Sequence, residues 1–226
     1  MRDACSMDQG FDGFGPAVFE WFEGLERDNS REFFGATRRL YDEEVRGGLE
    51  AMFEELAGVF GGDLKMFRQY RDLRFSRDRS PYKTTTYGVL YDVPGMHTGL
   101  YAQLSAGGLY AGTGYYQMSR DQLERYRQAV ADDVSGPRLV DAVDGARVSG
   151  LTVEGGGLRT APRGYPKDHP RIELLRLTSV IAGRSWPGSA GIRRDVALAG
   201  VTDCWRAAMP LTAWLDEHVG PSETAT

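Results

Sequence analysis

A basic segment of 19 residues, Lys65 to Lys83, is the part of the sequence best suited to bind an anion. It holds seven arginine and lysine residues against two aspartates, Asp72 and Asp78, a local charge of +5 in a chain of net charge −5. Arginine binds phosphate or carboxylate through two parallel hydrogen bonds, and lysine contributes a point charge. The segment therefore predicts a surface for small phosphate- or carboxylate-bearing ligands.

The predicted ligand-binding residues are those of this segment with a charge, a hydroxyl group or an aromatic ring: Arg68, Arg71, Asp72, Arg74, Ser76, Arg77, Arg79, Tyr82 and Lys83. If residues 66–75 form a strand, alternate side chains share a face, which places Arg68 and Arg74 together. A loop over residues 76–81 follows, and Lys83 begins the next strand. We therefore expect these three cations to converge at one end of a sheet, where loop amides and hydroxyls complete an anion cradle.

Two other interpretations of the basic segment stay open. In the first, Asp72 and Asp78 neutralise neighbouring arginines in a structural ion-pair network, in which Asp72 is buried. In the second, the segment contacts a nucleic-acid backbone while Tyr70, Phe75 and Tyr82 stack on bases. The negative net charge disfavours bulk attraction to nucleic acid, and the sequence contains no recognised nucleic-acid-binding module.

The second polar cluster runs from Lys167 to Arg171. His169 is the candidate catalytic residue, because an unperturbed histidine titrates near neutral pH and can transfer protons. A simpler interpretation is structural. Asp168 then caps a helix that begins at Pro170, and His169 makes a local hydrogen bond.

Several kinds of site are absent from the sequence. The glycine clusters lack the spacing of a phosphate-binding loop, and there is no G-x-S-x-G nucleophile motif. The three histidines have no metal-ligand spacing, and neither Cys5 nor Cys204 belongs to a C-x-x-C motif. We therefore predict no metal and no cofactor. Without a signal peptide or a long apolar run, the expected location is cytoplasmic and no membrane partner is expected.

The hydrophobic pattern predicts the elements that hold these residues. Helical spacing covers residues 16–25 and 30–60, and Asn29 or Ser30 is expected to cap the second stretch. An interruption is expected at Gly47 and Gly48. Residues 66–116 alternate as an antiparallel meander of about four strands, with a hairpin turn at Ala106-Gly107-Gly108. Helical spacing then returns in stretches after residue 119, the first of which begins at the capping-box pair Ser119 and Gln122. Pro210 is expected to kink or split the last of them.

This order of elements predicts an α+β fold, in which a central antiparallel meander sheet of about four or more strands is flanked by N-terminal and C-terminal helices. We expect a single domain over residues 14–218. Residues 1–13 and 219–226 are expected to be tails.

Three segments of the chain resemble one known family. They are FRQYRDLRFSRDRSPYK (residues 67–83), Asn29–Phe34 and Gly164–Pro170. Together they are similar to the family called domain of unknown function 2461, over about residues 14–218. Relatives typically show Lys near Arg77 and Arg79, and Gly-Pro-Leu at residues 47–49, where this chain has Gly-Gly-Leu. The resemblance implies an α+β fold and a cytoplasmic protein, and it implies no reaction.

Two hypotheses of function follow from these residues. In the first, the protein binds a small anionic ligand through the basic segment and acts on it with His169 as acid–base. In the second, it is a non-catalytic interaction domain whose basic segment docks an acidic partner or nucleic acid. A concave pocket favours the first hypothesis, and a flat or convex basic face favours the second.

Overall fold

The computed structural model describes residues 10–72, 74 and 78–223. The chain has the α+β fold that the sequence predicts, with helices beside a six-stranded antiparallel sheet of order β2-β3-β4-β5-β7-β6, and β1 pairs with β8 in a small separate sheet. Tertiary contacts divide the chain into two compact units. Unit 1 comprises residues 1–91, 101–110 and 185–202, and unit 2 comprises residues 92–100, 111–184 and 203–226. The expectation of one domain over residues 14–218 stays a prediction.

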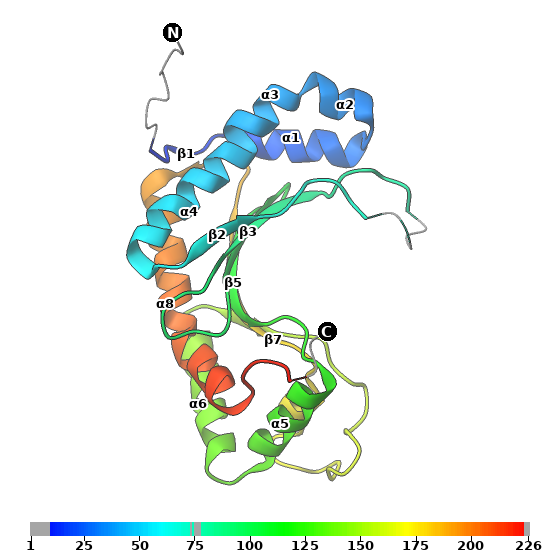
Figure 1. The fold of residues 1–226 in the computed structure, drawn as a ribbon, viewed down its shortest axis with the longest axis vertical. Helices are drawn as coiled ribbons and strands as arrows, with labels where there is room; N and C mark the ends of the chain where they lie inside the picture. The colour runs from blue at the N-terminus through cyan, green and yellow to red at the C-terminus, as the bar shows by residue number, and fades with distance from the viewer. Residues whose placement is uncertain (1–9, 73, 75–77, 224–226) are drawn as a thin grey trace. The chain divides into compact units, whose positions relative to one another are not determined.

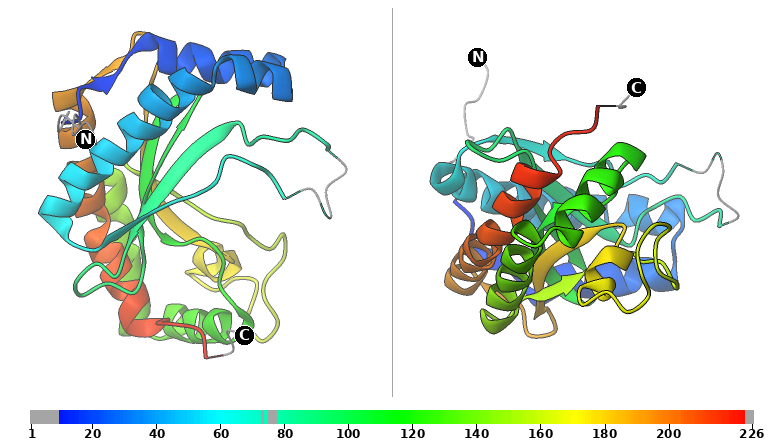
Figure 2. Two further views of the ribbon diagram at one scale, coloured as in Figure 1. Left: turned by 45° about the horizontal axis from the view of Figure 1, so that its top comes forward. Right: turned by 90° about the horizontal axis from the view of Figure 1, so that it is seen from below.

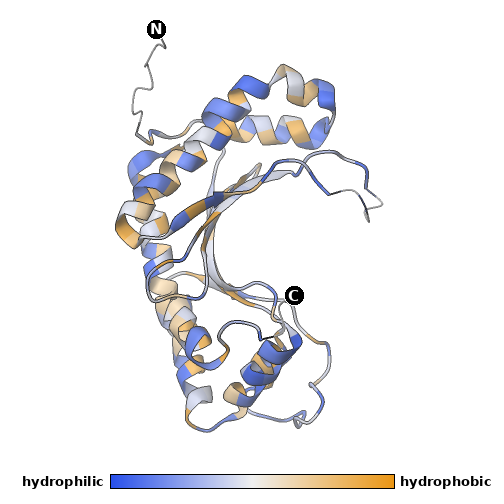
Figure 3. Cartoon of the chain, viewed as in Figure 1, coloured by the Kyte–Doolittle hydropathy of each residue, from blue (hydrophilic) through white to orange (hydrophobic). Residues whose placement is uncertain are grey.

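The N-terminal part of unit 1 is mostly helical (Figure 1). Its elements are β1 (Gly13–Phe14), α1 (Pro16–Arg27), α2 (Arg31–Ala36), α3 (Arg38–Leu40), the π-helical turn η1 (Tyr41–Arg46) and α4 (Gly47–Phe60). Hydrophobic and hydrophilic residues are interspersed along α1 and α4 (Figure 3), and the buried residues of both helices recur at helical spacing. Phe22 and Leu25 of α1 and Phe53 of α4 are fully buried, so these apolar faces form the core of the unit.

The predicted interruption at Gly47 and Gly48 is wrong. The turn η1 leads directly into α4, which begins at Gly47. A Cβ atom on Gly47 would lie 3.0 Å from the carbonyl oxygen of Asp42, so the missing side chain permits the close approach of the wider turn. Glycine here continues the helical segment instead of ending it.

The strands of the large sheet are β2 (Asp63–Met66), β3 (Thr85–Tyr91), β4 (Leu100–Ser105), β5 (Gly108–Tyr115), β6 (Thr152–Glu154) and β7 (Val180–Pro187), and β8 (Ile192–Arg193) pairs with β1. The β4–β5 hairpin turns where the sequence predicts it. Alternate residues of β3, among them Thr86 and Leu90, are buried, as expected for a strand with one face on the core.

The predicted strand from residue 66 to residue 75 does not form over residues 67–72. Strand β2 ends at Met66, and beyond it only an isolated bridge joins Tyr70 to Tyr82. Backbone hydrogen bonds flank this bridge, and the side-chain amides of Asn29 and Gln69 also bond the backbone of the returning chain. Periodicity alone could not reveal these hydrogen bonds between residues that are distant along the chain.

Unit 2 holds α5 (Arg120–Ala131), α6 (Ser135–Val148), α7 (Ile172–Arg176) and the C-terminal part of α8 (Arg194–His218). The capping box of Ser119 and Gln122 begins α5 as predicted. Helix α8 is continuous through Pro210, so the expected split does not occur. The loss of one backbone hydrogen bond at this proline is tolerated because Leu211 and Leu215 beside it are fully buried.

Both ends of the described chain are packed. Phe11 is buried, and its N–H donates to the Glu55 carboxylate over 3.1 Å. Near the other end, Val219 is buried and the carbonyl of Gly220 accepts from the Gln122 side chain at 2.8 Å. Among the residues described, no helix is both long and apolar enough to span a membrane.

Candidate anion-binding site

The basic segment lies on an arm of unit 1 that connects β2 to β3. We define the arm as residues 67–72 and 78–84. Its two sides run beside each other (Figures 1 and 2). On either side of the Tyr70–Tyr82 bridge, the Lys83 N–H donates to the Gln69 carbonyl and the Arg71 N–H donates to the Pro81 carbonyl, each over 2.9 Å. The arm therefore holds its side chains on a defined backbone near the bridge.

Gln69 fixes the base of the arm from inside. Its side chain is buried, and its amide nitrogen donates to the Lys83 carbonyl. Its amide oxygen accepts from the Thr86 hydroxyl at 2.9 Å and from the Tyr41 hydroxyl at 3.4 Å. A buried amide with its hydrogen bonds made to three elements specifies one position for the arm.

Asn29, in the loop between α1 and α2, anchors residues 78–84 of the arm. Its Nδ2 donates to the Tyr82 carbonyl over 3.1 Å, and the Tyr82 N–H donates to its Oδ1 over 3.0 Å. Ser30, not Asn29, caps α2, because the Ser30 hydroxyl accepts from the Phe33 N–H at 3.0 Å. The motif Asn29–Phe34 thus serves two purposes, a helix cap and an anchor for the arm.

A cluster of aromatic rings supports the arm from below. The Phe34 and Tyr82 rings are both buried and stacked, with centroids 4.1 Å apart and an interplanar angle of 12°. Tyr70 lies 5.0 Å from Tyr82 and 6.2 Å from Phe34 between ring centroids, yet 48% of Tyr70 is exposed. Burial, together with a hydrogen bond to Tyr70, raises the pKa of Tyr82 above its usual value.

A pocket of about 590 Å³ lies beside the arm, and we call it the arginine pocket. It is lined by Arg31, Arg68, Tyr70, Arg71, Asp72, Arg74 and Pro81. Among the described residues, four guanidinium groups and one carboxylate therefore line a shared space. The sequence predicted four of these charged residues, and Arg31 of α2 completes the set.

Two of the four arginines have carboxylate partners. Arg74 donates to Asp72 from Nε over 3.0 Å and from a terminal nitrogen over 2.6 Å. These hydrogen bonds lower the pKa of Asp72 to about 2. Arg71 pairs with Asp78, and the pKa of Asp78 lies below its usual value because the Ser80 side chain and then Arg71 donate to it.

These pairs do not form a buried network. The Asp72 side chain is 41% exposed and that of Arg74 is 77% exposed. Asp72 contacts the N–H and guanidinium of Arg74, two residues along the chain. The pair is therefore local and open to solvent, unlike the buried aspartate that a structural network requires.

Arg31 and Arg68 differ from the other two arginines. Both are exposed, and among the described residues neither has a carboxylate within ion-pair distance. The backbone carbonyl of Arg68 accepts from the Lys83 ammonium at 2.7 Å, which fixes the main chain and leaves the guanidinium in the pocket. Sequence reasoning overlooked Arg31 because it followed a helix cap. Its place in the Asn29–Phe34 motif was the signal.

The other predicted ligand-binding residues lie elsewhere. Lys83 does not line the arginine pocket. Its ammonium also donates to the Tyr87 hydroxyl over 3.0 Å, and it borders a separate polar pocket with Asp78 and Ser80. Arg79 is exposed outside both pockets, and Tyr82 is buried beneath Tyr70. Ser76 and Arg77 lie outside the described residues.

The candidate catalytic residue His169 belongs to unit 2 and holds a turn. Its Nδ1 accepts from the Arg171 N–H over 3.0 Å, just before α7. The expected cap from Asp168 is wrong, because α7 begins at Ile172 without a side-chain cap and Asp168 is exposed. That His169 and the basic segment share one site stays a prediction.

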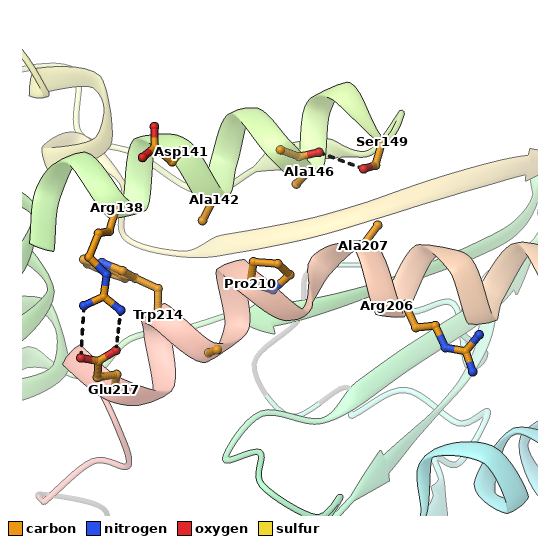
Figure 4. Close-up of a pocket in the computed structure, with 12 residues that line it drawn as sticks. Arg138, Asp141, Ala142, Ala146, Ser149, Arg206, Ala207, Pro210, Trp214 and Glu217 are labelled. Carbon is orange, nitrogen blue, oxygen red and sulfur yellow. Dashed lines mark hydrogen bonds and ion pairs between the residues drawn. The ribbon is translucent and has the colours of Figure 1, made fainter.

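Unit 2 has a groove of its own, of about 590 Å³, between α6 and α8 (Figure 4). Its walls include the small side chains of Ala142, Ala146 and Ala207, and an ion pair between Arg138 and Glu217 crosses one end (Figure 4). The Ser149 hydroxyl donates to the Gly145 carbonyl over 2.9 Å, so it finishes α6. The groove is the contact line of two helices and offers no converging set of reactive groups.

Within the described part of the chain, no group of three or more His, Cys, Asp or Glu residues could hold a metal ion. Residues 17–214 match the family described as Conserved hypothetical protein (DUF2461), which covers most of the chain. No curated protein matches the sequence significantly.

Proposed function

The chain belongs to the DUF2461 family, and from this premise we propose that it binds a small phosphate- or carboxylate-bearing ligand in the arginine pocket. Arg31 and Arg68 are the principal contacts in this proposal. Arg74 and Arg71, whose carboxylate partners are exposed to solvent, supply additional positive charge.

The unequal pairing of the four arginines is the observation that carries the proposal. Arg71 and Arg74 have the partners Asp78 and Asp72, whereas Arg31 and Arg68 line the same pocket without one among the described residues. A guanidinium group presents five N–H donors, and a phosphate or carboxylate satisfies two of them in a planar pair. An anion between Arg31 and Arg68 therefore supplies what the described protein groups leave unsatisfied.

The arm is held in place before a ligand binds, which favours such a contact. Asn29 and Gln69 hold the backbone around Tyr70 and Tyr82 before any ligand arrives. Binding then costs less conformational entropy than it would on a free loop. The pocket of about 590 Å³ has room for a small molecule and is widely open to solvent.

Direct titration calorimetry with inorganic phosphate, pyrophosphate and citrate tests this proposal. Arg31→Gln and Arg68→Gln each remove one charge, and each should weaken binding about tenfold or more, because a hydrogen bond to a charged group is lost. Arg27→Gln is the matched control, since Arg27 is an exposed arginine of the same unit that lines neither pocket at the arm.

The control separates a local contact from overall charge. Equal weakening by Arg27→Gln would indicate general electrostatic attraction and would contradict a specific pocket. Affinity should also fall as salt rises, because exposed charges are screened. A ligand bound only by the folded protein should raise the melting temperature of the wild type and raise it less in the two pocket variants.

A reaction on the ligand, with His169 as the acid–base, is the finer part of the proposal. It requires that His169→Asn abolishes turnover of a ligand that the arginine pocket still binds. The cytoplasmic location belongs to the same proposal. A non-catalytic domain that docks an acidic partner or nucleic acid through the arm is the alternative, and it predicts that polyanions bind much more tightly than any small anion.

A further inference from the structure

The arginine pocket has a neighbour whose lining is aromatic. A second pocket of about 530 Å³ is lined by Arg31, Phe34, Gly35, Arg38, Tyr70 and Tyr82, and we call it the ring pocket. Arg31 and Tyr70 line both pockets, so the two spaces share a border. The described lining of the arginine pocket is mostly charged, whereas three of the six described residues that line the ring pocket are aromatic.

Tyr70 is placed as a platform within the ring pocket. Nearly half of it is exposed, although its neighbours Phe34 and Tyr82 are each only 3% exposed. The bridge to Tyr82 holds its backbone, and the stacked pair of Phe34 and Tyr82 supports its ring from within the unit. A ring that is held in place and open on one side is suited to stack on another planar ring.

The helix α2 leaves space for such a ring. Gly35 lines the ring pocket, and a Cβ atom built on it would meet no atom within 4 Å. Arg38 lies over the Phe34 ring, with its guanidinium carbon 5.6 Å from the centroid, and is paired with Asp42. The ring pocket therefore has a fixed cation on one side and open space beside α2.

From this juxtaposition we infer that the ligand carries a planar aromatic ring together with a phosphate group, as a free nucleotide does. The ring stacks on Tyr70 in the ring pocket, and the phosphate contacts Arg31 and Arg68 in the arginine pocket. This inference rests on the proposed function and narrows it from any small anion to the nucleotide class. The net charge of −5 disfavours a nucleic-acid polymer as the occupant.

Calorimetry with adenosine 5′-monophosphate and ribose 5-phosphate separates the two halves of the site. The nucleotide should bind about tenfold more tightly, because stacking of one base on an aromatic side chain contributes that much or more. Tyr70→Leu keeps an apolar side chain but removes the ring. It should weaken nucleotide binding about tenfold and weaken ribose 5-phosphate much less, because Tyr70 also lines the arginine pocket but contributes no charge to it.

A second variant, made in α2, tests the ring pocket without a substitution in the arm. Gly35→Leu places a side chain in the ring pocket from α2 and should weaken the nucleotide about tenfold without weakening ribose 5-phosphate. Gly58→Leu is its matched control, because Gly58 is also an exposed helical glycine with open space around its Cβ position and lines neither pocket. It should leave both affinities unchanged.

The possible results distinguish the inference from the proposed function. Equal affinities for the two phosphates, with both lost in Arg68→Gln, would overturn the ring and leave anion binding in place. Absence of binding by every phosphate would overturn both. A single-stranded decanucleotide that binds more than about a hundredfold tighter than the mononucleotide, through Tyr70, would overturn the assignment to a free nucleotide.

Discussion

Arg68 lies in one of the segments that resemble the family and Arg171 directly follows another, yet the two side chains are packed in opposite ways. Arg171 in unit 2 donates from Nε to the Val130 carbonyl over 2.6 Å and from a terminal nitrogen to the Ala131 carbonyl over 2.9 Å. Its side chain is only 12% exposed. Arg68 in unit 1 is exposed and has no carboxylate partner among the described residues.

The difference follows from what surrounds each guanidinium. Helix α5 ends at Ala131 and leaves carbonyl groups without helical partners, and Arg171 satisfies them. The lack of a side chain on Gly136 permits this insertion, since a Cβ there would lie 2.5 Å from Nε of Arg171. No comparable set of acceptors surrounds Arg68 in the described structure. We therefore expect an arginine in or beside these segments to contact a ligand only where the protein itself leaves its donors unused.

The largest effect we expect is on stability, from Arg171→Ala. It should lower the free energy of unfolding by about 3 kcal/mol, because several charge-assisted hydrogen bonds are lost and the end of α5 keeps unsatisfied carbonyls. Denaturant unfolding followed by circular dichroism measures the change. Arg68→Ala is the paired variant and should change stability by less than about 0.5 kcal/mol. Similar losses in both variants would remove the distinction between the two arginines.

A second effect concerns the anchor of the arm. Asn29→Ala removes both side-chain bonds to the Tyr82 backbone, one over 3.1 Å and one over 3.0 Å. We expect about 2 kcal/mol of destabilisation, because the Tyr82 backbone groups then lack these partners in a half-buried place. Phosphate affinity should fall as well, since the arm is less fixed.

Ser30→Ala is the control for the anchor. It removes the cap of α2 and should lower the free energy of unfolding by about 1 kcal/mol. Phosphate binding should weaken by no more than this loss of stability accounts for. If Ser30→Ala and Asn29→Ala weakened phosphate binding equally, the order of α2 and not the anchor would govern the site.

The sequence predicted the features of the protein that depend on local patterns. The β4–β5 hairpin, the capping box at Ser119 and the concentration of charge between Lys65 and Lys83 are all visible within a few residues. Each depends on near neighbours, so a periodic or spacing argument can find it.

The remaining features depend on partners that are distant along the chain. Asn29 and Tyr82 are 53 residues apart, and Arg171 meets carbonyls about 40 residues earlier. Arg31 also lines the arginine pocket from α2, which is distant from the arm along the chain. Local spacing offered Asn29 or Ser30 as a helix cap and gave Arg171 no role. Tertiary packing decides the roles of Asn29 and Arg171, and local patterns in a single sequence do not reveal that packing.

A third and smaller effect tests His169. His169→Ala removes the acceptor of the Arg171 N–H and should cost about 1 kcal/mol in denaturant unfolding. His169→Asn should restore most of this stability, because an asparagine side chain accepts from the N–H two residues ahead in the same kind of turn. A turnover assay on these variants then separates the roles. Activity lost in both variants would indicate catalysis, and activity that follows stability would indicate a structural role.

The smallest effect we expect is at Asp72, where the arginine pocket holds its one carboxylate. Hydrogen bonds from Arg74 lower the pKa of Asp72 from 3.8 to about 2, so the folded state favours the charged form. The stabilisation is therefore present above about pH 4 and is lost as the pH falls through about 2. Because both side chains are exposed, solvent screening keeps it small. The unfolding midpoint of Asp72→Asn at pH 7 should therefore match that of the wild type.

The same substitution should tighten phosphate binding about twofold at fixed ionic strength, because one repelling charge leaves the pocket and Arg74 is released to the ligand. Asp195→Asn is the matched control, since Asp195 forms an exposed pair with Arg193, also two residues apart, outside both pockets. It should leave phosphate affinity unchanged. Weaker phosphate binding by Asp72→Asn would show that Asp72 positions Arg74 for the ligand. A lowered unfolding midpoint would show instead that the arm depends on a structural ion pair, and Arg74 would then resemble Arg171 more than Arg68.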